Sequence, residues 1–108
     1  MKKFHIAIST DNLAAVVEDY SRRLGTKPCL VIADEYALWR TASLNISVRK
    51  DKSHAPRSLR HSGWEDSNAE AMTAETDVNG IIWERFTAKQ QAAEIREIWS
   101  EVDYRPES

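Results

Sequence analysis

A hairpin signal at residues 77–86, DVNGIIWERF, constrains the fold of this chain more than any other stretch, because it fixes the position of a carboxylate within a strand. Asn79 and Gly80 both tolerate a positive φ, so they suit the two central positions of a tight turn. Side chains alternate along the strand that follows, which puts Glu84 between two apolar neighbours on one face. A carboxylate placed there has to be paired, hydrogen-bonded or bound to a metal, since burying it alone is costly.

The size and charge of the chain indicate one compact domain. Its 108 residues are 42% hydrophobic, which is enough for one modest core and too little for two. The net charge is -2 and no long run of Lys or Arg occurs, so nothing in the sequence favours a nucleic acid as partner. The apolar run near the N-terminus ends at Ile8 with no cleavage site after it, so we expect neither secretion nor a membrane span.

The single cysteine, Cys29, excludes a framework of internal disulfides. It fits a reducing compartment, and we expect the protein in the cytoplasm. Its apolar neighbours predict a buried position on a strand.

The first half of the chain predicts the order strand, helix, strand, strand, strand. Alternation of apolar and polar residues places His5 on the more polar face of the first strand, and Asn45, Ser47 and Arg49 together on the polar face of the fourth. The helix follows the capping residues Thr10 and Asp11 and ends at Gly25. The expected strands are 3–9, 29–33, 35–41 and 43–49.

The second half is shorter, and it is joined to the first by the polar linker 51–57. We expect the domain to occupy residues 1–100, with a first module at 1–50, a second at 58–100 and a flexible tail at 101–108. The second module has room for strands at 58–65, 73–76 and 81–86 and for a final helix begun by a capping box of Thr87 and Gln90. A strand that carries a histidine opens each module, His5 in the first and His61 in the second.

Taken together, these segments resemble the vicinal oxygen chelate superfamily, which contains glyoxalases, bleomycin-resistance proteins, extradiol dioxygenases and carbon-arsenic lyases. The resemblance covers most of residues 3–86, and the order of the segments is that of the superfamily. The segments that carry it are FHIAIS with the following Asp11, Leu13, Tyr20, Leu24 and Gly25, then LNISVR, LRHSGWE and TDVNGIIWERF.

The resemblance implies an α+β fold of paired βαβββ-like modules that form an incomplete, mostly antiparallel barrel, here with a truncated second module and a C-terminal helix. It also implies that His5, His61 and Glu84 are metal ligands. The position at which glyoxalase I has a fourth ligand, a glutamate, is matched by Asn45. Because an amide is a poor ligand for a transition metal, the chain resembles the three-ligand dioxygenase or lyase branch.

Two imidazoles and one carboxylate suit Fe, Mn, Ni, Co or Zn as divalent ions and leave positions open for substrate oxygens. Asn45, Ser47 and Arg49 share one strand face and are the candidate substrate-binding residues. We therefore expect a metalloprotein that acts on a small oxygen-rich or aromatic molecule, as a dioxygenase or lyase if it is an enzyme.

Two other interpretations stay open. Some members of the superfamily bind no metal and sequester an antibiotic or other small molecule, and in such a protein His5 would be structural and Glu84 would pair with an arginine. The chain could also be a structural or regulatory dimer without a ligand. In every case the truncated second module leaves an apolar face uncovered, which favours a homodimer.

Overall fold

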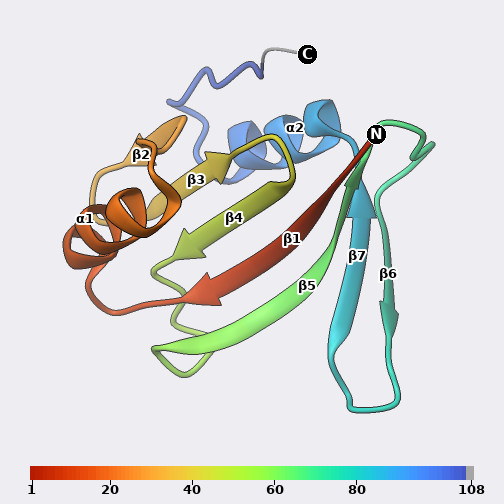
Figure 1. Ribbon diagram of the computed structural model, residues 1–108, viewed down its shortest axis with the longest axis horizontal. Helices are drawn as coiled ribbons and strands as arrows, with labels where there is room; N and C mark the ends of the chain where they lie inside the picture. The colour runs from red at the N-terminus through yellow and green to blue at the C-terminus, as the bar shows by residue number, and fades with distance from the viewer. Residues whose placement is uncertain (107–108) are drawn as a thin grey trace.

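The computed structural model describes residues 1–106 as one open sheet of seven strands with two helices (Figure 1). The predicted α+β class and the C-terminal helix are confirmed, and the sheet does not close into a barrel. Neither helix in this range is long and apolar enough to cross a membrane. The elements are β1 Lys2–Ser9, α1 Leu13–Leu24, β2 Leu30–Ile32, β3 Tyr36–Arg40, β4 Leu44–Arg49, β5 Ser58–Asp66, β6 Thr73–Thr76, β7 Ile82–Phe86 and α2 Ala88–Ile98.

The strands are ordered β2-β3-β4-β1-β5-β7-β6, which places the two modules side by side. In the first module β1 pairs parallel with β4, and in the second β5 pairs parallel with β7. The other neighbours pair antiparallel, including β1 with β5 at the junction of the modules. The second module has no counterpart of α1 or β2, as the short sequence after residue 58 predicts.

Helix α1 covers one face of the first module. Its N-cap is Asn12, whose side chain accepts a hydrogen bond from Ala15 N, and not Thr10 or Asp11 as the sequence suggested. Gly25 ends the helix with a φ of 70°, the left-handed conformation predicted for it. The helix packs on β3 and β4 in a core of four buried residues, Leu13, Ala37, Trp39 and Val48.

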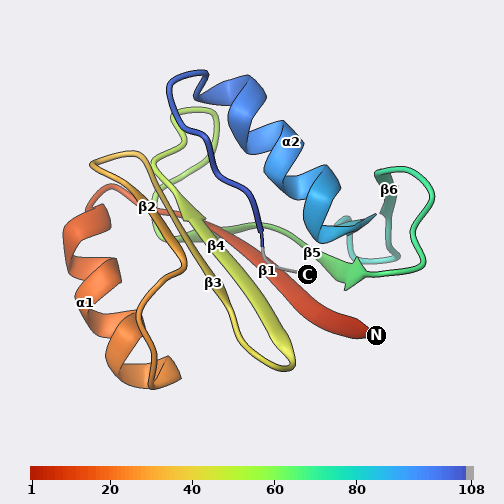
Figure 2. The ribbon, with the colours of Figure 1, turned by 90° about the horizontal axis from the view of Figure 1, so that it is seen from above.

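Helix α2 covers the opposite face of the sheet, so the first module is enclosed between two helices (Figure 2). The predicted capping box is confirmed, because Thr87 Oγ1 accepts from Gln90 N and Gln90 Oε1 accepts from Thr87 N. Ile95 of this helix is buried against Tyr36 and Leu38. The face under α2 is called the concave face below, and the face under α1 the convex face.

The polar face of β1 is the better buried one. His5, Ala7 and Ser9 lie on the concave face and are buried, while the apolar side chains of Phe4, Ile6 and Ile8 on the convex face are only half-buried. Alternation alone suggested that the apolar face would be packed. The difference arises because α1 covers only part of the convex face and the second module supplies no helix to cover the rest.

The uncovered part of the convex face is apolar. Trp64 and Leu59 lie on it, opposite β1 residues of the same face, and their exposed fractions are 36% and 45%. This is the uncovered surface that the truncated second module predicts.

The turn between β6 and β7 is wider than the predicted two-residue turn. Gly80 has a φ of 78°, whereas Asn79 keeps a negative φ. The Asp77 carboxylate accepts hydrogen bonds from the backbone N–H groups of Asn79 and Ile81, and Asp77 O accepts from Gly80 N. These bonds make a type I turn around Val78 and Asn79 with Gly80 as the left-handed residue after it.

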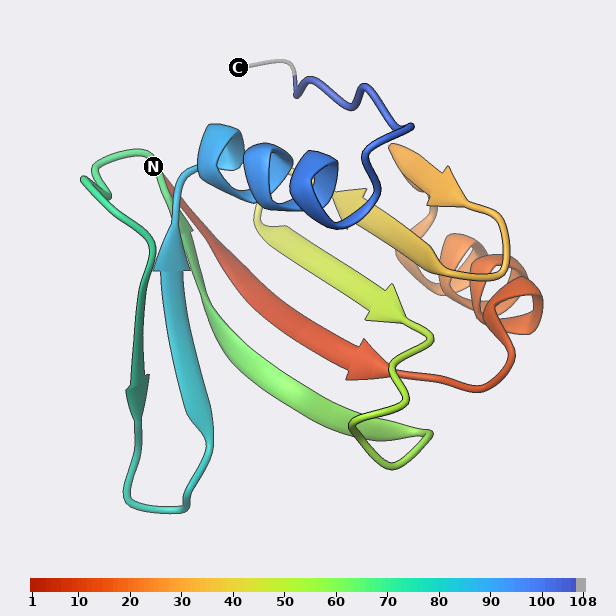
Figure 3. The same cartoon turned by 180° about the vertical axis from the view of Figure 1, so that it is seen from behind.

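The C-terminal segment runs back beside the edge strand β2 (Figure 3). Arg96 donates a hydrogen bond to Tyr104 O at 2.7 Å, and the Tyr104 hydroxyl lies 3.7 Å from Cys29 Sγ. Cys29 is exposed and precedes β2, so the prediction of a buried strand position was wrong. Residues 107–108 of the predicted flexible tail lie outside the described residues.

Gly63 allows β5 and β7 to approach at the centre of the sheet. A Cβ atom at this position would lie 2.0 Å from Glu84 O, and the φ of 152° also disfavours any other residue. We expect Gly63→Ala to lower the free energy of unfolding by at least about 3 kcal/mol, against about 1–2 kcal/mol for Gly25→Ala, which meets open space. Urea denaturation of the two variants tests this, and equal losses would contradict it.

Candidate metal centre

The three predicted ligand residues come from three neighbouring strands. His5 on β1 lies opposite Gly63 on β5, and Gly63 lies opposite Glu84 on β7. His61 is two residues before Gly63 and therefore faces the same side of the sheet. Because Gly63 has no side chain, the space between the flanking residues is open to the imidazole of His61.

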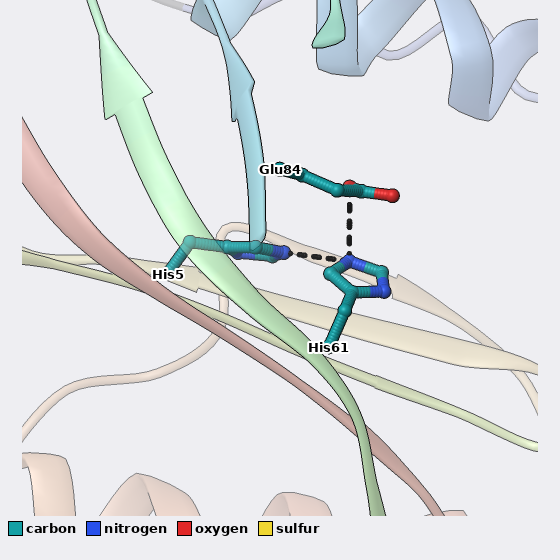
Figure 4. A group of neighbouring side chains, drawn as sticks. All are labelled: His5, His61 and Glu84. Carbon is teal, nitrogen blue, oxygen red and sulfur yellow. Dashed lines mark hydrogen bonds and ion pairs between the residues drawn. The ribbon is translucent and has the colours of Figure 1, made fainter. Parts of the chain in front are cut away.

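The donor atoms of these residues converge on the concave face (Figure 4). His5 Nε2 lies 3.0 Å from His61 Nε2, and His61 Nε2 lies 3.0 Å from Glu84 Oε1. All three donor atoms lie within 4.8 Å of one another. The group could hold a metal ion.

Asn45 orients the imidazole of His5. His5 Nδ1 lies 3.0 Å from Asn45 O and 2.9 Å from Asn45 Oδ1. Both atoms are hydrogen-bond acceptors, so the proton of a neutral His5 is on Nδ1 and the lone pair of Nε2 points toward His61 and Glu84. A metal ligand requires this tautomer, and such an orienting contact is typical of metal-bound histidines.

The amide of Asn45 is itself fixed by a buried network. Its Nδ2 donates to Glu65 Oε1 and to Gln91 Oε1, both at 2.8 Å, and its Oδ1 accepts from Gln91 Nε2. Glu65 in turn accepts two hydrogen bonds from the guanidinium of Arg40. Because Nδ2 faces a carboxylate, the side-chain oxygen of Asn45 must face His5.

The three candidate substrate-binding residues divide between two places. Ser47 and Arg49 line a cavity above the three donor atoms. Asn45 is fully buried behind His5 and is not among the described residues that line this cavity. Gln91 and Glu65 were not predicted as site residues, because a glutamine on a helix and a glutamate at the end of a strand carry no signal that separates them from surface residues.

The electrostatics of the site favour the ionisation states that a metal requires. Burial, with a contribution from His61, lowers the pKa of His5 to about 4, although the contacts with Asn45 oppose the shift. Burial alone would raise the pKa of Glu84, but the hydrogen bond with His61 and the positive charges of His61, His5 and Arg60 together outweigh it and the pKa is lowered. At neutral pH His5 is therefore an uncharged imidazole and Glu84 a carboxylate.

The cavity has a volume of about 340 Å³ and lies between the concave face and α2. Phe86 forms one wall and contacts the edge of the His5 ring, with the centroids 4.8 Å apart. The polar and charged residues that line it, besides the three donors, are Tyr36, Ser47, Arg49, Arg60, Gln91 and Glu94. The apolar ones are Met72, Phe86, Ile95, Ile98 and Trp99.

The donor set fits a divalent transition-metal ion. Two donors at right angles on a metal, each with a bond of about 2.1 Å, are roughly 3 Å apart, and both short contacts in the group have this length. Two histidines and one carboxylate that leave other positions open are the ligands of non-haem iron sites and are compatible with Zn, Mn, Co and Ni.

The fold and the site define an α+β protein with an open sheet, whose concave face carries a histidine and carboxylate cluster beneath a cavity. No family model matches the chain, and no curated protein matches it. The fold is similar to the crystal structure described as NAD-dependent benzaldehyde dehydrogenase from Legionella pneumophila, with a TM-score of 0.56 and 12% identity, over 78% of this chain and 97% of that chain. At this identity the likeness shows the fold alone.

We predict that Asn45→Ala lowers the free energy of unfolding by about 2–4 kcal/mol, because it removes the buried partner of Gln91 and one buried hydrogen bond each from Glu65 and His5. Asn68→Ala is the matched control, since that side chain is exposed, and it should change stability by less than about 0.5 kcal/mol. Urea denaturation gives both values. A cost for Asn45→Ala no larger than the control would contradict the network described above.

We also predict that the metal-free protein loses stability between pH 6.5 and about 4 through His5. In this range the unfolded chain has His5 protonated and the folded chain does not, so the unfolded state binds more protons and acidification favours it. Comparing wild type with His5→Gln over this range isolates the contribution. Parallel pH profiles for the two proteins would contradict the prediction.

Proposed function

We propose that this chain is a metal-binding protein of the vicinal oxygen chelate type, which holds a divalent ion through His5, His61 and Glu84 and binds a small oxygen-bearing molecule in the cavity above them. The observation that carries the proposal is the convergence of three donor atoms, with contacts of 3.0 Å, at a cavity of about 340 Å³. A metal-ligating histidine almost always donates its other ring N–H to an acceptor of the protein, and His5 donates in this way to Asn45.

When bound, such an ion supplies a Lewis acid with open positions for substrate oxygens. The chain supplies the rest of the site. Asn45 holds His5 in the ligating tautomer, Phe86 and α2 limit access of water, and Ser47 and Arg49 present polar groups to a ligand. The range of metals proposed is Fe, Mn, Ni, Co and Zn, the ions that accept two imidazoles and a carboxylate.

The order of the elements supports the type of protein proposed. Each module begins with a strand that carries one histidine of the cluster, and the carboxylate comes from the last strand, as the sequence resemblance implies. The amide of Asn45 is turned toward Nδ1 of His5, which supports a site with three protein ligands rather than four.

The runner-up is a binding protein that uses the same cavity without a metal. It is favoured by the 3.0 Å contact between His61 and Glu84, because a hydrogen bond from the imidazole satisfies the carboxylate without a metal ion. The two proposals differ in whether the cluster is needed to bind metal or only to shape the cavity.

We predict that protein purified without a histidine tag and incubated with Fe(II), Mn(II), Ni(II), Co(II) or Zn(II) retains one of these ions at near-equimolar amount after desalting. Glu84→Gln and His61→Ala should retain at least tenfold less metal, because each removes a ligand. His54→Ala is the matched control, since His54 is an exposed histidine of the linker. Elemental analysis measures the metal, and circular dichroism checks that each variant is folded.

The metal should also raise the melting temperature of wild type but not of Glu84→Gln, because an ion bound to the folded state alone stabilises it. Folded wild type that retains none of the five ions would overturn the metal proposal and leave the metal-free binding protein. Equal retention in wild type and Glu84→Gln would show that the ion binds elsewhere.

A further inference from the structure

Arg49 is the feature of the cavity that the metal site does not explain. Two arginines of the described residues line the cavity. Arg60 donates a hydrogen bond to Asp51 at 2.8 Å, whereas no carboxylate of residues 1–106 lies within 4.0 Å of the Arg49 guanidinium. Glu94 also lines the cavity and feels the charge of Arg49, but the two side chains make no ion pair. Arg49 is half-buried, so its positive charge is held at the cavity without an ion-paired carboxylate from the described residues.

The guanidinium of Arg49 is nevertheless held in place. Its central carbon lies over the ring of Trp99 at 5.1 Å, and the ring of Trp99 in turn packs against Tyr36, with the centroids 5.0 Å apart. Stacking on an aromatic ring fixes the plane of the guanidinium but leaves its N–H donors free for an acceptor. A fixed plane with two parallel donors matches the two oxygens of a carboxylate.

Arg49 and the donor cluster lie at different ends of the cavity. Asn45 is opposite His5 on β1, and Arg49 is four residues farther along β4, about 13 Å at the rise of a strand. Ser47 lies between them on the same face. Ile95 lies on α2 between Gln91, which contacts Asn45, and Trp99, which contacts Arg49, so the middle of the cavity has an apolar wall.

The charges of the cavity also favour an anion. A divalent ion and Arg49 together exceed the negative charge of Glu84 and Glu94, and Asp51 already balances Arg60. A neutral ligand would leave this excess uncompensated in a partly enclosed site.

We propose that the cavity binds a small carboxylate whose apolar body separates two functional ends: a pair of adjacent oxygens at His5, His61 and Glu84, and a carboxylate on the guanidinium of Arg49. This ligand class rests on the proposed metal site for its first end and on Arg49 and Trp99 alone for its second. The two ends can therefore be tested separately.

The test uses two probes that share one chelating group. Benzohydroxamate and 4-carboxybenzohydroxamate have the same adjacent oxygens and the same ring, and only the second has a carboxylate at the far end. Their affinities are measured by isothermal titration calorimetry on Zn(II)-loaded wild type, Arg49→Gln and Arg23→Gln, with the metal content of each protein determined before and after. Arg23→Gln is the matched control, because it removes one positive charge from the exposed surface of α1.

We expect 4-carboxybenzohydroxamate to bind wild type and Arg23→Gln at least tenfold more tightly than benzohydroxamate does. This preference should vanish in Arg49→Gln, while benzohydroxamate binds all three proteins alike. Equal affinities of the two probes for metal-loaded wild type would overturn the anion site and leave the metal site standing. A preference that survives Arg49→Gln would also overturn it, since the carboxylate would then bind elsewhere.

Failure of the metal site has a different signature. If no protein retains metal, the same comparison is made on the metal-free proteins with benzoate and terephthalate, which carry one and two carboxylates. Binding of benzoate and terephthalate that is lost in Arg49→Gln and kept in Arg23→Gln would keep the anion site without the metal. Binding of neither would overturn the anion site as well.

Discussion

The hydrogen bond between His5 and Asn45 is the interaction on which the rest of the site depends. It fixes the tautomer and the plane of the imidazole, so the lone pair of Nε2 points at the other two donors. The same amide joins β4 to Glu65 on β5 and to Gln91 on α2. One buried side chain therefore holds the candidate ligand, the junction of the two modules and the helix that covers the cavity.

The short second module decides which face of the sheet becomes the interior. A full second helix would cover the convex face of β5 and β7, but the chain provides none, and Trp64 and Leu59 remain exposed there. The helix that the second half does provide, α2, lies over the concave face and buries the polar residues of β1 and β4. The polar groups thus enclosed need partners, and the network around Asn45 satisfies them.

Local patterns of the sequence predicted much of this arrangement. The alternation in the first strand placed His5 on its polar face, and the capping box at Thr87 predicted the start of α2. That His5, His61 and Glu84 meet was implied by the resemblance of the segments to a known superfamily. Local patterns could not predict that the polar face of β1 would be the buried one, because that depends on which helices cover the sheet. They could not assign Asn45 to His5 either, since the contact depends on the parallel register of β1 and β4. The width of the turn after Asp77 was also not predicted, because it depends on hydrogen bonds that the Asp77 carboxylate accepts from backbone N–H groups.

We propose that the two imidazoles and the Glu84 carboxylate bind one ion. X-ray absorption spectroscopy of the metal-loaded wild-type protein can count the imidazoles, because imidazole rings bound to a metal give a characteristic outer-shell scattering. We predict a nearest shell of nitrogen and oxygen at about 2.0–2.2 Å with scattering from two imidazoles. A spectrum with no imidazole scattering, or with that of only one imidazole, would contradict this set of ligands.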